Sequence, residues 1–185
     1  FIMAVFAGCT TSSTEYPQVI KVYGERHHVQ GIAFDESSGL LYSSFTSSFL
    51  KSGVEGELIG SITGINGHLG AMTFDPASRK VYASLEMKDD AIGRNISTAL
   101  GVNAYTREQS RFYIAEIDVD KVNGPDTPFE EAVILHKIED AGKDYAAEVE
   151  VNGVKLEHRY GCSGIDGVAV APAFGNKKNR TNERY

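Results

Sequence analysis

The segment HVQGIAFD at residues 28–35 recurs as HLGAMTFD at residues 68–75, an offset of 68 − 28 = 40 residues. The similarity continues into the following segment, where ESSGLLYSS at 36–44 aligns with PASRKVYAS at 76–84. Each copy contains a short apolar run, an acidic turn and a second run that carries a tyrosine. Short apolar runs bounded by Gly, Asp and Ser predict β-strands rather than helices.

A repeat of this length, with several short strands in each unit, predicts a β-propeller whose blades are four-stranded antiparallel sheets. The first unit shows all four strands, which are predicted at Gly31–Phe34, Leu40–Phe45, Phe49–Lys51 and Leu58–Thr63. The 19 glycines also favour a turn-rich β protein, because Gly adopts the positive φ angles that tight turns require. The predicted fold class is therefore all-β.

The second unit is longer than the first, and two insertions are predicted to account for the difference. Residues 88–110 form an inserted loop, with a short helix near Ile96–Leu100. The outer strands of this unit are predicted at Arg111–Asp118 and Ala132–Ile138. The alternating run Tyr145–His158 predicts an extra hairpin, because its Asn152-Gly153 dipeptide suits a type I′ turn.

A third copy of the repeat begins with GIDGVAVAP at residues 164–172, and Arg184-Tyr185 falls where its second strand should begin. Residues 18–185 are thus predicted to form about two and a half blades, with repeats that start near 28, 68 and 164. A closed propeller needs at least about four blades. We therefore expect the 185 residues to be a fragment of a longer chain.

The blade opening resembles that of bacterial propellers of the quinoprotein-like, NHL and gluconolactonase families, in which a segment of the form GIAFDxxxGxLY recurs. Residues 31–42, GIAFDESSGLLY, have this form. The resemblance covers about half of the residues from His28 onward. It implies an architecture rather than an activity, because such propellers include enzymes, binding modules and scaffolds. The alternative architecture is a β-sandwich in which the two Phe-Asp turns coincide by chance.

The loop before each innermost strand is the predicted ligand-binding site, because these strands line the central channel of a propeller. The repeat alignment places five polar residues at or near this entrance: His28, Gln30, His68, Ser163 and Asp166. Convergent polar groups at a concave mouth predict a ligand site, and an imidazole can bind a metal or move a proton near neutral pH. The structural alternative is that each histidine hydrogen-bonds a neighbouring blade, as the WD-repeat histidine does.

The N-terminal residues 5–9, VFAGC, resemble the lipobox that ends a bacterial lipoprotein signal peptide. The resemblance implies that Cys9 carries a lipid anchor and holds the protein on a membrane of the bacterial cell envelope. Residues 1–9 are then the signal peptide end, and residues 10–17 form a polar tether. Phe6 departs from the usual Leu, and no basic segment precedes the apolar stretch. The alternative is a buried first strand that ends with a free cysteine.

The composition excludes nucleic acid as a partner, because 25 acidic against 18 basic residues give a net charge of −7 without a basic cluster. No catalytic motif is found, since GCSGI at 161–165 lacks the final Gly of a nucleophile elbow. The sequence therefore predicts a membrane-anchored binding module for a small molecule, a glycan or a protein. The alternative, implied by the gluconolactonase resemblance, is a hydrolase or lactonase that holds a divalent cation, with Asp166 as the carboxylate at the aligned positions.

Overall fold

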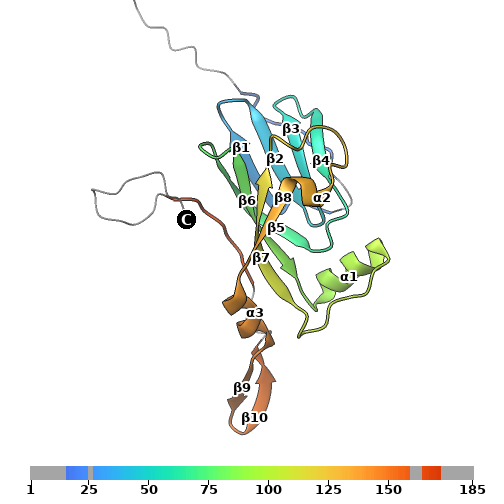
Figure 1. Cartoon of the computed structure of the whole chain (residues 1–185), viewed down its shortest axis with the longest axis vertical. Helices are drawn as coiled ribbons and strands as arrows, with labels where there is room; N and C mark the ends of the chain where they lie inside the picture. The colour runs from blue at the N-terminus through green and yellow to red at the C-terminus, as the bar shows by residue number, and fades with distance from the viewer. Residues whose placement is uncertain (1–15, 25–26, 159–163, 172–185) are drawn as a thin grey trace, which may run out of the picture.

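The two aligned segments fold as two antiparallel hairpins, and two further strands extend each hairpin into a four-stranded sheet (Figure 1). The computed structural model describes residues 16–24, 27–158 and 164–171. In both sheets each strand pairs with the next one along the chain. The predicted all-β class, built from four-stranded antiparallel sheets, is confirmed.

Both sheets have the strand order of the chain, and β2 and β7 begin and end at the predicted residues. The first sheet consists of β1 (Gly31–Asp35), β2 (Leu40–Phe45), β3 (Ser48–Gly53) and β4 (Leu58–Ile62). The second sheet consists of β5 (His68–Asp75), β6 (Lys80–Met87), β7 (Arg111–Asp118) and β8 (Val133–Lys137).

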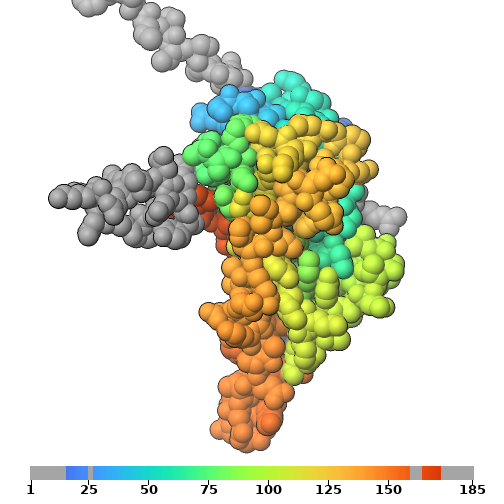
Figure 2. All heavy atoms as spheres, viewed as in Figure 1, coloured from blue at the N-terminus to red at the C-terminus, as the bar shows by residue number. Residues whose placement is uncertain are grey.

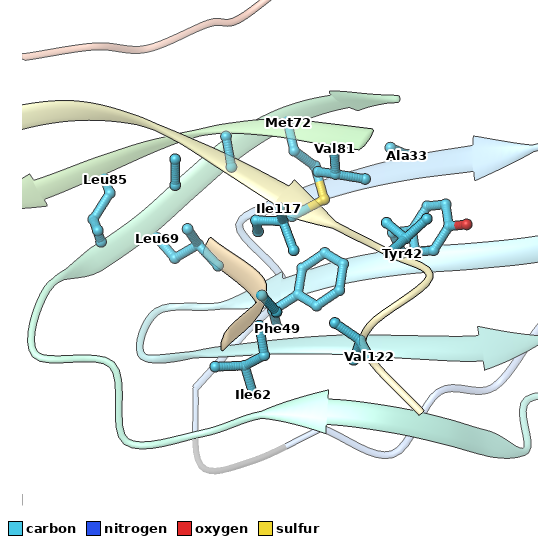
Figure 3. Packing of buried hydrophobic residues seen from close by; sticks show 14 of the residues in the cluster. Ala33, Tyr42, Phe49, Ile62, Leu69, Met72, Val81, Leu85, Ile117 and Val122 are labelled. Atoms are coloured by element: carbon cyan, nitrogen blue, oxygen red, sulfur yellow. The ribbon is translucent and has the colours of Figure 1, made fainter. Parts of the chain in front are cut away.

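One hydrophobic core joins the two sheets, because alternate residues of their strands face each other (Figure 3). Its fully buried side chains come from both sheets and include Tyr42, Phe49, Ile62, Leu69, Val81, Leu85 and Ile117. The strands β1 and β5, which are the first strands of the two sheets, lie against each other. A Cβ atom at Gly31 would lie 2.5 Å from the carbonyl oxygen of Gly70, so a larger residue does not fit there.

Asp35 and Asp75, the last residues of β1 and β5, form the same turn in the two units. The Asp35 carboxylate accepts hydrogen bonds from the Ser37 backbone N–H at 3.0 Å and from the hydroxyls of Ser37 and Ser38 at 2.6 and 2.5 Å. Asp75 makes equivalent bonds two and three residues further on. The Phe-Asp repeat therefore marks strands that end in a turn held by their own carboxylate.

Arg79 and Lys51 connect the two units by polar contacts. Arg79 donates from Nη1 to Asp35 at 3.2 Å, and from Nε and Nη2 to the Asp120 carboxylate at 2.9 and 2.8 Å. Lys51 of β3 is 5% exposed and donates to the carbonyl oxygen of Val119 at 2.9 Å. Burial lowers the pKa of Lys51 below its ordinary value. These contacts fix β3 and the first turn to the chain that follows β7.

The chain between β7 and β8 covers the outer edge of the first sheet. Gly124 forms a parallel bridge with Gly60 of β4, and its backbone hydrogen-bonds Ile59 and Ser61. An uncovered edge strand presents unpaired N–H and C=O groups that invite association with other chains. The segment between β7 and β8 of the second unit therefore covers β4, the edge strand of the first sheet, and connects the two units by backbone hydrogen bonds.

The predicted insertion contains the helix α1 (Ala91–Leu100), which is longer than the predicted helix. It begins after Asp90, whose side chain accepts a hydrogen bond from the Gly93 N–H at 2.7 Å. It ends at Gly101, which has a φ of 69° and closes the last turn. Capping residues at both ends thus define this helix.

Two further helices were not predicted. The helix α2 (Phe129–Ala132) is a single turn before β8, and α3 (Glu139–Ala146) precedes the hairpin of β9 (Glu148–Val151) and β10 (Val154–Glu157). The hairpin projects from the body of the molecule (Figures 1 and 2). Its turn has the predicted positive φ angles, 53° at Asn152 and 77° at Gly153. The predicted strand from Tyr145 was wrong at its start, because Tyr145 lies in α3 and packs on Phe112.

The strand predicted at the start of the third copy is also corrected, since residues 164–171 form no strand. A strand requires a hydrogen-bonded neighbour. The neighbour that the repeat predicts begins at Arg184, outside the described residues. Cys9 and Ser163 lie outside them as well. Within the described part of the chain, no helix is both long and apolar enough to cross a membrane.

Candidate functional site

A cavity of about 280 Å³ lies beside the start of β5 and the end of β6, where residues 165–166 meet the second sheet. Its polar lining residues are Gln30, His68, Ser84, Glu86, Lys88 and Asp166. The rest of its lining is small or apolar and consists of Gly70, Ala71, Ile92 and Ile165. A smaller cavity of about 120 Å³ adjoins it, because Gln30 and Ile92 line both.

Because β1 and β5 are neighbours, the residues at the starts of these two strands lie close together. Gln30 donates its backbone N–H to the Ser44 carbonyl oxygen at 2.9 Å, which continues the β1–β2 ladder beyond β1. Leu69 of β5 donates to the Thr46 carbonyl oxygen at 2.6 Å, so β5 is tied to the end of β2. Leu69 points into the core, and His68 before it therefore points to the opposite face of the sheet.

Glu86 lies opposite His68 in the β5–β6 ladder and is 6% exposed. Its carboxylate lies 2.6 Å from Lys88 Nζ and accepts a hydrogen bond from the Ile165 N–H at 2.5 Å. Burial alone lowers the pKa of Lys88, but the hydrogen bond and charge of Glu86 outweigh burial and raise it above its ordinary value. Lys88 therefore remains charged and paired, and Glu86 holds residues 164–166 against the cavity.

His68 presents an uncharged imidazole to the cavity. Burial lowers the pKa of His68 below its ordinary value, although the nearby Glu86 carboxylate acts in the opposite direction. A neutral imidazole has one N–H donor and one acceptor nitrogen. Its Nε2 atom is buried and has no hydrogen-bond partner among the described residues. Because an unpaired buried polar atom costs about 1–3 kcal/mol, a bound group that pairs with Nε2 is favoured.

Gln30 lies at the boundary between the two cavities. Its Nε2 atom is 3.0 Å from His28 Nε2, and it donates to the Thr46 hydroxyl at 3.4 Å. His28 is exposed and lines the smaller cavity. The two imidazoles of the repeat therefore face different cavities, and Gln30 contacts both cavities.

Of the five residues that the sequence singled out, four line these adjoining cavities. Gln30, His68 and Asp166 line the larger one and His28 the smaller one, whereas Ser163 lies outside the described residues. The structural alternative for the histidines finds little support, since neither imidazole hydrogen-bonds a strand of the other sheet among the described residues.

Glu86 and Lys88 were not among the residues predicted from the sequence to form the binding site. The sequence marks Glu86 only as a candidate calcium ligand together with Asp89 and Asp90. Counting outward from the turn at residues 76–79 pairs β5 with β6 and places Glu86 near His68. The count is one residue out at that point, because the register shifts between Leu69 and Met72. The β5–β6 pairing could therefore have indicated that Glu86 lies near His68, but the register shift places the two residues one position away from where the count predicts.

The acidic residues near the cavity already have protein partners. Glu86 pairs with Lys88, Asp89 with Arg94 at 2.7 Å, and Asp90 caps α1. Among the described residues, no three His, Cys, Asp or Glu side chains form a group that could hold a metal ion.

Comparison with known proteins finds no matching family model, no matching curated protein and no matching solved structure. The function of this chain is therefore argued from the chemistry of its own residues. The larger cavity is lined by residues from both repeat units, by the side chain whose imidazole Nε2 atom is buried, and by the two residues of the buried ion pair.

Proposed function

We propose that the chain is a ligand-binding module of the β-propeller type, which binds a small molecule at the entrance of its innermost strands. Three features support the propeller: the two meanders, the contact between β1 and β5, and the similar turns at Asp35 and Asp75. In such an architecture successive blades bring their innermost strands together around one axis. Polar residues before those strands then meet at a common site.

The observation that carries the binding proposal is the Nε2 atom of His68, which is buried and has no hydrogen-bond partner among the described residues, on a side chain that lines the larger cavity. Native proteins rarely leave such an atom unsatisfied. Unpaired buried atoms in the described chain belong to Tyr42, Asn66, His68 and Ser97, and of these residues His68 lines one of the two cavities. Gln30 and Asp166 line the same cavity from other segments of the chain. A concave pocket with a few convergent polar groups is the usual form of a small-molecule site.

Replacing His68 by Phe is expected to weaken the binding of small-molecule fragments by at least about tenfold, because the ring is retained while both nitrogens are lost. The experiment screens a chemically diverse fragment library against the 185-residue chain by ligand-observed NMR. The dissociation constants of the hits are then measured for the native protein and the variant.

The matched control is His136→Phe, the same substitution at an exposed histidine of β8 that pairs with Glu116 at 2.8 Å, away from both cavities. This variant is expected to bind the hits as the native protein does. Equal binding to His68→Phe and to the native protein, with both folded, would place the fragments elsewhere and contradict the proposed site.

We also propose that the protein is an exported lipoprotein of the bacterial cell envelope, anchored through Cys9. The support is the Ala7-Gly8-Cys9 segment and the polar stretch Thr10–Thr14 that follows it. Acyl chains contribute about 0.8 kcal/mol per buried methylene, so several chains on one cysteine bind a membrane firmly. The membrane is then the first partner of this chain.

The Cys9→Ala variant is expected to move from the membrane fraction to the soluble fraction when the gene is expressed in a bacterium. The change removes the thiol that would be acylated, while the folded body is untouched. Fractionation followed by immunoblotting measures the distribution, with Cys162→Ala as the control that should remain on the membrane. Retention of Cys9→Ala on the membrane would contradict the anchor.

A further inference from the structure

We infer that the larger cavity binds an uncharged, hydroxyl-rich molecule of the size of one sugar ring. This inference rests on the proposed binding function, because it specifies the ligand of the same cavity. It follows from three properties of the lining: the balance of charge, the kind of hydrogen-bonding groups and the volume.

The balance of charge disfavours anions. Lys88 is the cationic side chain among the described residues that line the two cavities, and it lies 2.6 Å from Glu86 and 3.6 Å from Asp90. Asp166 adds a further carboxylate to the lining. A phosphate or carboxylate ligand would therefore have to compete with Glu86 and Asp90 for the Lys88 ammonium group, which both carboxylates already neighbour.

Cations are disfavoured because the Glu86 carboxylate already has partners within the protein. The buried Glu86 carboxylate contacts Lys88 and accepts the Ile165 N–H, and Asp166 also interacts with another group of the protein. Both carboxylates of the described lining are therefore already engaged. No Phe, Tyr or Trp side chain appears among the described lining residues of the larger cavity, so that lining offers no cation–π site of the usual kind. The described residues also provide no group of three metal ligands.

The remaining lining groups suit hydroxyls. The neutral imidazole of His68, the amide of Gln30 and the hydroxyl of Ser84 include both donors and acceptors. A ligand hydroxyl can donate and accept at once, so a polyol satisfies such a mixed set. Ile92 and Ile165 add apolar contacts that suit the C–H face of a ring.

The volume limits the size of the ligand. Pockets for drug-sized ligands span about 300–1,000 Å³, and the cavity of about 280 Å³ lies below this range. One pyranose or furanose ring suits this volume better than a nucleotide or an oligosaccharide. An unbranched apolar molecule of the same size would leave the Nε2 atom of His68 unpaired.

The test measures binding of three matched sugars to the native chain by isothermal titration calorimetry: glucose, glucuronate and glucosamine. The series keeps one ring and changes the charge from neutral to negative and positive, and galactose and mannose repeat the neutral case. We expect at least one neutral sugar to bind at least about tenfold more tightly than both charged analogues. We expect His68→Phe to weaken that binding by at least about tenfold, and His136→Phe to leave it unchanged.

Other outcomes separate this inference from the proposed function. If glucuronate or glucosamine binds more tightly than every neutral sugar, the ligand class is wrong, while the cavity remains a binding site. If no sugar binds but library fragments bind in a manner that depends on His68, the inference fails and the proposed function stands. If neither sugars nor fragments depend on His68, both are overturned.

Discussion

Replacing Phe49 by Ala is expected to lower the free energy of unfolding by about 3–5 kcal/mol, the cost of removing a buried aromatic ring from a packed core. The Phe49 side chain is fully buried and stacks on the Tyr42 ring, with 5.9 Å between ring centroids. It lies between the two sheets, among core residues of both (Figure 3). The cavity that Ala leaves is therefore bounded by two rigid sheets, which limits how far the core can collapse to fill it.

The matched control is Phe34→Ala in β1, the same substitution at a side chain that is 37% exposed and makes an edge contact with Tyr16. Because much of the Phe34 ring already contacts water, its loss is expected to cost less than half as much. Urea denaturation followed by circular dichroism measures both variants. Equal losses for the two variants would contradict a single core between the sheets.

The strands could be predicted because each is bounded by turn chemistry that is visible in the sequence. β2 and β7 match their predicted bounds, and the turns after β1 and β5 contain the aspartates that hold them. The repeat added what composition could not, since it identified equivalent strands in the two units. Local propensity and repeat pattern agree in these segments, and the structure follows both.

The helix α3 shows where an alternating sequence pattern wrongly predicted a strand, at Tyr145. Its sequence, EDAGKDYA, places Glu139 and Asp140 in the first turn and Lys143 in the last, which favours a helix through the helix dipole. Its buried residue, Tyr145, packs on Phe112 of β7, and such a tertiary contact cannot be read from spacing. The single-turn α2 is too short for any periodicity to show.

The candidate site could be predicted in the part that the repeat encodes. Gln30 and His68 were found because the repeat alignment places both near the starts of equivalent strands, and both line the larger cavity. Glu86 lies near the end of β6 and Lys88 just after it, where the repeat alignment gives no functional signal. Their role depends on the strand register across an irregular pair and on the burial of their charges, which only the assembled sheet provides.

Acidification is expected to reduce the stability of the native protein by about 2 kcal/mol through Asp35 alone. Burial by itself would raise the pKa of Asp35, but hydrogen bonds from Ser37, Ser38 and Arg79 outweigh it and lower the pKa from 3.8 to about 2. The unfolded chain therefore binds a proton at higher pH than the folded chain. The stabilisation is fully present above pH 4–5 and is lost as the pH falls through 3.8 to about 2.

The variant Asp35→Asn isolates this contribution, because an amide does not titrate in that range. The stability difference between the native protein and the variant is expected to shrink by about 2 kcal/mol from pH 6 to pH 2 in urea denaturation curves. The control is Asp140→Asn, the same substitution at a side chain that is 96% exposed, which corrects for the general effect of removing one negative charge. A native-minus-Asp35→Asn difference that does not change with pH would show that the buried turn at Asp35 does not hold an ionised carboxylate. The Phe-Asp repeat would then owe its structure to packing of the phenylalanines rather than to the charge beside them.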